Sequence, residues 1–253
     1  MQLLDTLSDQ LLSRLLSRRG LRAAPASKSP RILHPEVWEA VRAHTMTNPP
    51  RVDALYAAVE QIVAAGIEGD LVECGVYRGG CSMAMALALR AAGAQERFIW
   101  LYDTFEGMTR PDGNDVRIHD GTPAAEKFEA TATGENTSTW CADDLGTVRS
   151  NMLSTGYPAE KLRFVAGPVE ETLRKPPIPE RIALLRLDTD WYASTRVELE
   201  VLMPRVVPGG VLIIDDYNTW AGSRRAVDEY FKTRQRPTLF PVGGGGSVIG
   251  TIS

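Results

Sequence analysis

Four aspartates follow two apolar segments in the C-terminal half of the chain. Asp188 and Asp190 come after the segment IALLRL, and Asp215 and Asp216 come directly after GVLII. Both segments are short and rich in leucine and β-branched residues, which is typical of strands buried on both faces of a parallel sheet. The carboxyl ends of such strands meet at the edge where open α/β sheets bind ligands. Because like charges repel there, we expect a hard divalent cation with oxygen ligands between them.

Each aspartate taken singly also fits a turn or a helix N-cap, since Asp is common at both. The whole stretch from Leu184 to Tyr217 predicts a strand, a loop, a helix, a turn and a second strand. That order brings both acidic pairs to one sheet edge, which favours a shared site over four separate caps.

A glycine-containing turn follows the first predicted strand, in the segment DLVECGVYRGG. Glu73, Gly75 and Gly79 stand there without the GxGxxG spacing, so the dinucleotide fingerprint is not matched. Glycines at this position still let the backbone approach a ligand closely and present a helix N-terminus. Just before this unit, the stretch HTMTNPPR makes Thr47 a candidate ligand contact, with a helix N-cap as the alternative.

The next predicted strand, RFIWLY, ends in Asp103, which is 28 positions beyond Gly75. An acidic residue at the end of the second strand of a βαβ unit normally hydrogen-bonds a ribose diol. A turn-forming aspartate is the alternative. Together with Glu73 at the end of the first strand, Asp103 favours an adenosyl ligand.

Residues 107–141 form a long polar connection, and connections of that length are either disordered or functional lids. His119 is the only plausible base within it, and a solvated loop histidine is the alternative. We expect this lid and the N-terminal region to set the choice of acceptor.

Bulk composition narrows the function classes. Of 253 residues, 28 are Lys or Arg and 32 are Asp or Glu, and no dense basic block lies outside the N-terminal segment, which argues against nucleic-acid binding. No apolar run approaches the roughly 20 residues of a membrane span. The three cysteines lack metal-type spacing, so we expect a reduced, cytoplasmic protein without structural disulfides.

The N-terminus carries leucines at 3, 4, 7, 11, 12, 15 and 16, which is a helical stripe. We expect a helix that packs on the domain or on a partner subunit, and hence a homo-oligomer; a peripheral membrane helix is the alternative. The expected organisation is a helical extension and linker at 1–44 followed by one domain at 45–253.

The remaining order of elements is alternating β and α with a C-terminal hairpin around the glycines at 243–246. It predicts a three-layer, doubly wound α/β fold with a mostly parallel seven-stranded sheet and an antiparallel C-terminal hairpin. Five blocks carry a more specific likeness: LVECGVYRGG, LYDTFEGM, VAGPVEETL, the Leu184 to Tyr217 stretch and GSRRAVDEYF. From about Thr45 onward, the chain resembles the macrocin O-methyltransferase family of class I S-adenosylmethionine-dependent methyltransferases.

That resemblance implies methyl transfer from S-adenosylmethionine to a sugar hydroxyl of a natural product, with Mg²⁺ as the metal. It implies cofactor contacts at Glu73, Gly75, Gly79, Ser82, Asp103, Thr104 and Gly167. Thr47 is a further candidate because of its position before the first strand. Where the family usually has a large residue near the adenine, this chain has Pro168.

For the metal the resemblance implies Asp188, Asp215 and Asp216 as ligands. Asp188 is also the expected catalytic base, with His119 and Asp190 as the other candidates. The choice between Asp188 and Asp190 as the third ligand stays open at the level of the sequence.

Other functions compete with this one. A metal-dependent methyltransferase acting on a catechol-type phenol shares the acidic strand ends, and a non-catalytic adenosyl-binding module shares the glycine turn. A nicotinamide dehydrogenase fits poorly, because the fingerprint spacing fails and no hydride-transfer pair stands out.

Overall fold

The computed structural model describes residues 32–253, so the leucine-striped segment lies outside the described residues. The described part contains a seven-stranded sheet with the order β3-β2-β1-β4-β5-β7-β6. Its strands are β1 (Asp70–Cys74), β2 (Ile99–Asp103), β3 (Leu162–Ala166), β4 (Ile182–Leu187), β5 (Val206–Ile214), β6 (Phe240–Val242) and β7 (Ser247–Thr251). Only the pairs β5–β7 and β6–β7 are antiparallel. The predicted fold class is confirmed.

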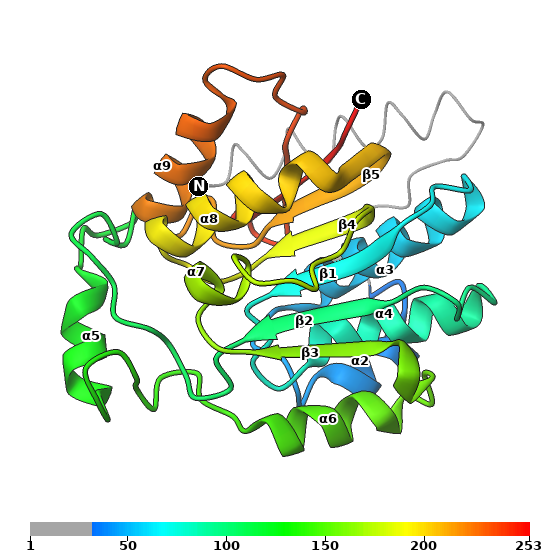
Figure 1. The fold of residues 1–253 in the computed structure, drawn as a ribbon, viewed down its shortest axis with the longest axis horizontal. Helices are drawn as coiled ribbons and strands as arrows, with labels where there is room; N and C mark the ends of the chain where they lie inside the picture. The colour runs from blue at the N-terminus through cyan, green and yellow to red at the C-terminus, as the bar shows by residue number, and fades with distance from the viewer. Residues whose placement is uncertain (1–31) are drawn as a thin grey trace. The chain divides into compact units, whose positions relative to one another are not determined.

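Helices cover both faces of the sheet (Figure 1). They are α2 (Pro35–Val41), α3 (Pro49–Ala64), α4 (Gly80–Ala91), α5 (Ala124–Thr131), α6 (Leu145–Ser154), α7 (Val169–Thr172), α8 (Tyr192–Val201) and α9 (Ala221–Phe231). One core joins buried side chains of α2, α3, α4 and α6 to one face of the sheet, and a second joins α7, α8 and α9 to the other. The structure thus places α2 on the body of the domain, whereas the sequence analysis assigned residues 1–44 to an extension.

The strand order reverses between β1 and β4, since the chain runs outward from β1 to β3 on one side and from β4 to β5 on the other. Doubly wound sheets bind ligands in the crevice at this switch point, beyond the carboxyl ends of the strands. All six residues of β4 are buried, as expected for a strand covered on both faces.

The segment 107–141 is ordered and contains α5, a helix that its polar composition did not indicate. Figure 1 shows α5 standing outside the two helical layers. Isolated bridges tie this lid together and to the start of α9, including Val116 with Pro123 and Arg117 with Trp220.

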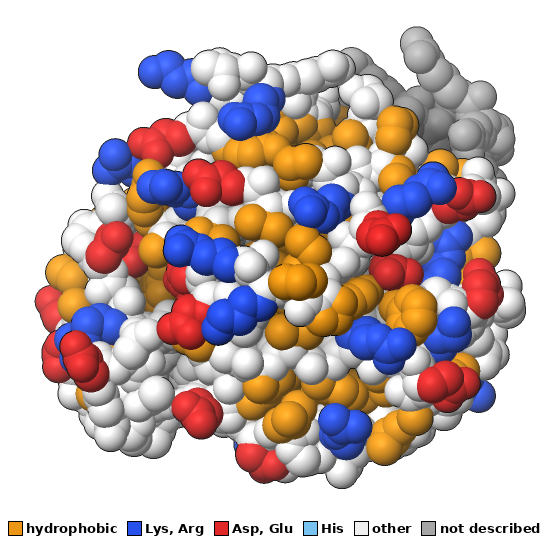
Figure 2. Space-filling model, in the orientation of Figure 1, with side chains coloured by type: hydrophobic (Ala, Val, Ile, Leu, Met, Phe, Trp, Pro, Cys, Tyr) orange, Lys and Arg blue, Asp and Glu red, His pale blue; other side chains and the backbone are white. Residues whose placement is uncertain are grey.

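On the face shown in Figure 2, basic and acidic side chains are interspersed, and neither kind forms a large patch. Among the described helices, none has the length and apolar character needed to cross a membrane. The three cysteines, Cys74, Cys81 and Cys141, all have free thiols.

Candidate functional site

Three aspartates converge beyond the ends of β4 and β5. The carboxylates of Asp188, Asp215 and Asp216 each offer an oxygen within 4.8 Å of the others. Asp188 follows β4 by one residue, and Asp215 and Asp216 directly follow β5, so neighbouring parallel strands bring them together as the sequence predicted. Burial raises the pKa values of Asp188 and Asp216, with neighbouring carboxylates adding to the effect.

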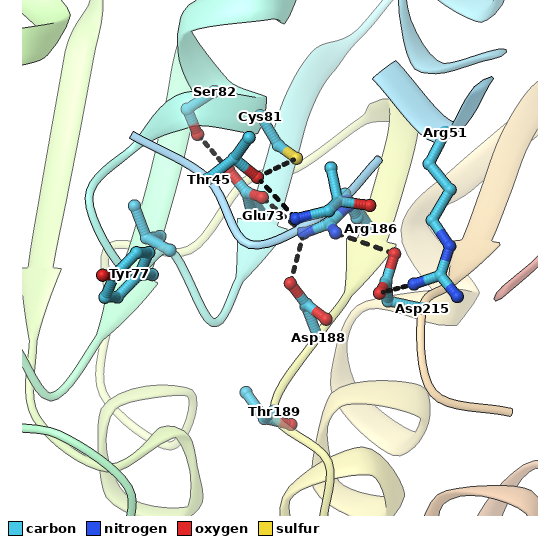
Figure 3. A network of polar contacts seen from close by, with 12 residues as sticks. Thr45, Arg51, Glu73, Tyr77, Cys81, Ser82, Arg186, Asp188, Thr189 and Asp215 are labelled. Atoms are coloured by element: carbon cyan, nitrogen blue, oxygen red, sulfur yellow. Dashed lines mark hydrogen bonds and ion pairs between the residues drawn. The ribbon is translucent and has the colours of Figure 1, made fainter. Parts of the chain in front are cut away.

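Arg186 organises this cluster, and the sequence analysis did not single it out. Its side chain is 4% exposed. One guanidinium nitrogen lies 2.6 Å from Glu73 Oε1 and 2.6 Å from Asp188 Oδ2, and the other lies 2.8 Å from Asp215 Oδ1 (Figure 3). The available signal was a charged residue inside the buried run IALLRL, because a buried arginine needs anionic partners.

A second arginine reaches the same cluster from α3. Asn48 caps this helix by accepting from the backbone N–H of Arg51, and the Arg51 guanidinium then lies 2.7 Å from Asp215 Oδ2 (Figure 3). Both oxygens of Asp215 are therefore held. Burial alone would lower the pKa of the Arg186 guanidinium, but the surrounding carboxylates raise it well above its ordinary value, so Arg186 is charged.

The charges around this edge do not balance. Two guanidiniums, Arg51 and Arg186, form ion pairs with three acidic side chains, Glu73, Asp188 and Asp215. Two further acidic side chains, Asp190 and Asp216, lie beside these aspartates. With every carboxyl ionised, the group has an excess of three negative charges. Like charges this close need a further cation or protons to remain buried.

Asp190 differs from Asp188 in its partners. Among the described residues its carboxyl forms no ion pair with a lysine or arginine, whereas Asp188 lies 2.6 Å from Arg186. Burial, followed by the charges of Asp188 and Asp215, raises the pKa of Asp190 to about 7.

On the other side of the switch point, the loops are held together mainly by hydrogen bonds from backbone N–H groups. Asp103, at the end of β2, accepts hydrogen bonds from the backbone N–H groups of Val76 at 2.6 Å, Tyr77 at 3.1 Å and Phe105 at 2.8 Å. The turn after β1 is thus fastened to the end of β2. Thr104 donates to the backbone carbonyl of Gly107 at 2.6 Å.

Glycine is required where the turn after β1 meets the loop after β4. Gly75 has φ +82°, and a Cβ there would lie 2.1 Å from the backbone oxygen of Asp188. Gly79 has φ +88° and is the N-cap of α4. These two positions match the glycines that the sequence analysis selected.

A cleft runs between these loops. Its lining includes Gly75, Asp103, Thr104, Gly167 and Asp188. The structure therefore brings four of the predicted cofactor residues together beside one of the predicted metal ligands.

Three other predicted cofactor residues are placed differently. Glu73 is 1% exposed and Ser82 is fully buried, and the Ser82 hydroxyl donates to Glu73 Oε2. Thr47 lies in the loop before α3, where its hydroxyl is buried and has no hydrogen-bond partner among the described residues.

His119 lies in the segment 107–141, and its ion-pair partner is not one of the acids at the strand ends. Its side chain is 90% exposed, and its partner is Asp120, at 3.8 Å. The lid is anchored elsewhere by three buried tryptophans, with ring centroids 5.4 Å apart for Trp140 and Trp191 and 5.2 Å apart for Trp191 and Trp220.

Backbone strain is concentrated around the cleft. The described non-glycine residues with positive φ are Tyr77 (50°), Phe105 (55°), Cys141 (54°) and Asp190 (70°). They lie in the loops after β1, β2 and β4 and at the end of the lid. Such conformations are unfavourable and persist where the surrounding structure enforces them, which is common at functional sites.

Comparison with known proteins identifies the kind of site. The family described as macrocin-O-methyltransferase matches residues 35–239, which confirms the resemblance carried by the five blocks. An "8-demethyl-8-(2,3-dimethoxy-alpha-L-rhamnosyl)-tetracenomycin-C 4'-O-methyltransferase" of Streptomyces olivaceus is 39% identical over 207 residues, 79% of this chain and 72% of the relative.

A second relative is a demethyldecarbamoylnovobiocin O-methyltransferase of Streptomyces niveus, 36% identical over 194 residues, 76% of this chain and 69% of the relative. Among solved structures, the O-methyltransferase NovP is similar with a TM-score of 0.72 and 29% identity, covering 83% of this chain and 82% of NovP.

Proposed function

The chain belongs to the macrocin O-methyltransferase family and is an S-adenosylmethionine-dependent O-methyltransferase, and we propose that its acceptor is a sugar hydroxyl of a glycosylated natural product. The relative from Streptomyces olivaceus supports this acceptor class, because its name specifies a rhamnosyl compound. We further propose that the reaction depends on Mg²⁺ and takes place in the cytoplasm.

One observation carries the proposal: three carboxylates lie within 4.8 Å of one another, and one of them, Asp188, lines the cleft that contains Gly75 and Asp103. The donor set fits Mg²⁺, which prefers hard oxygen ligands and a small number of carboxylates. A divalent cation would also offset most of the excess negative charge, and a sulfonium cofactor would add one more positive charge. We assign Asp188, Asp215 and Asp216 as the metal ligands.

The cleft fits an adenosyl cofactor next to the acids. We assign Asp103 to the ribose hydroxyls, since it ends the second strand of the βαβ unit. Gly75 and Gly79 let the backbone of the first turn approach the cofactor closely, and Thr104 and Gly167 line the same cleft. When bound, S-adenosylmethionine supplies the methyl group, and Mg²⁺ supplies positive charge that makes an acceptor hydroxyl more acidic.

The chain's own residues must then orient the acceptor and accept its proton. Methyl transfer is a single in-line displacement, so positioning contributes much of the rate. We propose Asp190 as the proton acceptor, because Asp188 already binds Arg186 at 2.6 Å whereas Asp190 lacks an arginine or lysine partner within the described chain. The exposure of His119 makes it the weaker candidate.

The proposal is tested in two stages on the full chain. Calorimetry with S-adenosylhomocysteine and with Mg²⁺ should show binding of each. Turnover with S-adenosylmethionine is then screened against rhamnosylated polyketides, other glycosylated macrocycles and simple catechols, with a mass gain of one methylene as the readout. Chelation with EDTA should abolish turnover, and added Mg²⁺ should restore it.

Each part of the proposal has its own contrary result. Turnover that survives EDTA would contradict the magnesium requirement. Methylation of catechols in preference to every glycoside would replace the acceptor class by phenols. A failure to bind S-adenosylhomocysteine would remove the assigned cofactor cleft.

A further inference from the structure

The position of Glu73 is unexpected for a residue that touches the cofactor. It is the penultimate residue of β1, where it is 1% exposed and both of its carboxylate oxygens are engaged within the protein. Oε1 accepts from Arg186 at 2.6 Å and Oε2 accepts from the Ser82 hydroxyl (Figure 3). Arg186 in turn binds Asp188 and Asp215, two of the residues assigned to the metal.

Strand register explains why these groups meet. Glu73 on β1 is paired directly with Arg186 on β4, and Arg186 is paired with Ile213 on β5. Side chains alternate between the faces of a strand, so Asp188 and Asp215, each two residues beyond one of these partners, follow the same side. The result is a continuous row, from Ser82 through Glu73 and Arg186 to the acids.

We propose that Glu73 is a positioning residue of the metal site and acts on it through Arg186. The inference rests on the magnesium site proposed above. A single guanidinium is shared among three carboxylates, so the strength of its bond to Glu73 sets how closely it holds Asp188 and Asp215. The closer Arg186 lies to these two aspartates, the more it competes with a metal ion for their oxygens.

Two partners of Glu73 favour its ionised form. Burial raises the pKa of Glu73, whereas Arg186 and the hydrogen bond from Ser82 oppose that rise. Residues behind metal ligands that fix their orientation commonly change metal affinity by about 10–100-fold when they are replaced.

The first test is calorimetric titration of Mg²⁺ into the full chain without cofactor, comparing wild type with Glu73→Gln. Glutamine keeps the shape but removes the charge, so Arg186 should turn to its remaining anionic partners, Asp188 and Asp215. We expect about tenfold weaker Mg²⁺ binding. Thermal unfolding of the same samples shows that the variant is folded.

Ser82→Ala tests whether Glu73 acts on the metal site through Arg186, because it changes the hydrogen bonding of Glu73 without changing any charge. It removes the hydrogen bond to Glu73 Oε2, which leaves that carboxylate free to hold Arg186 more strongly. Mg²⁺ binding should then become about threefold tighter, opposite in direction to the effect of Glu73→Gln and smaller, because one hydrogen bond is lost and no charge.

Asp103→Asn is the matched control for a change of charge. Asp103 ends β2, the strand beyond β1, and neighbouring strands are about 4.8 Å apart, so it is farther from the acids than Glu73 and makes no contact with Arg186 among the described residues. Mg²⁺ affinity should be unchanged, while affinity for S-adenosylhomocysteine should fall.

The outcomes separate this inference from the proposed function. Wild-type protein that binds no Mg²⁺ would overturn the metal site itself. Wild-type binding with unchanged affinity in Glu73→Gln would overturn only the role of Glu73. Equal weakening by Glu73→Gln and Asp103→Asn, or no tightening in Ser82→Ala, would show that the charge acts through space and overturn transmission through Arg186.

Discussion

The two halves of the site are built in different ways. The glycine half, formed by residues 75–79 and 103–107, is held by backbone groups, with three N–H donors converging on Asp103. The acidic half, formed by Arg186, Asp188, Asp190, Asp215 and Asp216, is held by side-chain charges, with Arg186 alone joining three carboxylates.

This difference predicts different sensitivities. The loops of the glycine half do not tolerate added atoms at glycine positions, because their geometry depends on φ and on close approach. The buried charges of the acidic half are most sensitive to the loss of one charge. Removing one partner leaves an unpaired ion in the interior, which is destabilising. The halves meet where Gly75 packs on the loop after β4.

Gly75→Ala should therefore have the largest effect. The new Cβ would lie 2.1 Å from the Asp188 backbone oxygen, at φ +82°. We expect a loss of more than about 4 kcal/mol in the free energy of unfolding, since overlap with backbone adds to conformational strain. Urea unfolding measures it, and binding of both S-adenosylhomocysteine and Mg²⁺ should be lost.

The control for this change is Gly93→Ala, at φ +71° with no atom within 4 Å of the added Cβ. Only the strain of a left-handed residue remains there, about 1–2 kcal/mol. Equal losses at the two positions would mean that the contact between the halves contributes nothing.

Asp190→Asn should have the next largest effect, now on rate. Removal of a proton acceptor lowers turnover by about 10²–10³-fold, within the usual range for general bases, while the affinity for S-adenosylhomocysteine stays near wild type. His119→Ala is the comparison, and with its side chain 90% exposed it should keep wild-type turnover. The reverse pattern in steady-state kinetics would move the base from the acidic half to the lid.

Glu198, on α8, contacts the loop after β4, which is where the two halves of the site meet. It is fully buried on α8, and the Thr189 hydroxyl donates to its Oε1 at 2.8 Å. Burial raises the pKa of Glu198 from 4.5 to about 8. The protonated Glu198 therefore contributes stability that is fully present below about pH 4.5 and is lost as the pH rises through about 8.

Glu198→Gln should remove that pH dependence. Between pH 6 and pH 9 wild type should lose about 3 kcal/mol more unfolding free energy than the variant, at 1.36 kcal/mol for each of roughly two pH units between pH 6 and the raised pKa. Urea titrations of both proteins at the two pH values measure the difference. Parallel losses would show that Glu198 is ionised at neutral pH, held by partners other than those seen here.

Local patterns made the glycine half predictable. Gly75, Gly79 and Asp103 belong to one βαβ unit, and each position is required by a turn or a strand end close in sequence. The fold class was predictable for the same reason, since alternating strands and helices are a local signal. The helix α5 was not, because it has only 8 residues and buries only Ala124 and Phe128, which is a weak local signal.

The acidic half was only partly predictable. Strand ends gave the positions of Asp188, Asp215 and Asp216, but the contact of Arg186 with Glu73 depends on register between strands more than 100 residues apart in the chain. The same register removes Glu73 from the cleft. No pattern within a single segment shows which of two acids at the end of a strand faces inward.

Thr47→Val is expected to have the smallest effect and tests whether the glycine half extends to the loop before α3. The Thr47 hydroxyl is buried with no partner in the described chain, so replacing it by a methyl group should leave the unfolding free energy within about 1 kcal/mol of wild type or raise it slightly. If the cofactor supplies the missing partner, affinity for S-adenosylhomocysteine should fall about fivefold, because a neutral hydrogen bond contributes about 1 kcal/mol. Thr45→Val is the matched change two residues away, where the hydroxyl already accepts from the Thr47 backbone N–H at 3.2 Å; it should lower stability instead of cofactor affinity. Unchanged affinity in Thr47→Val would confine the cofactor contacts to the loops after the strands.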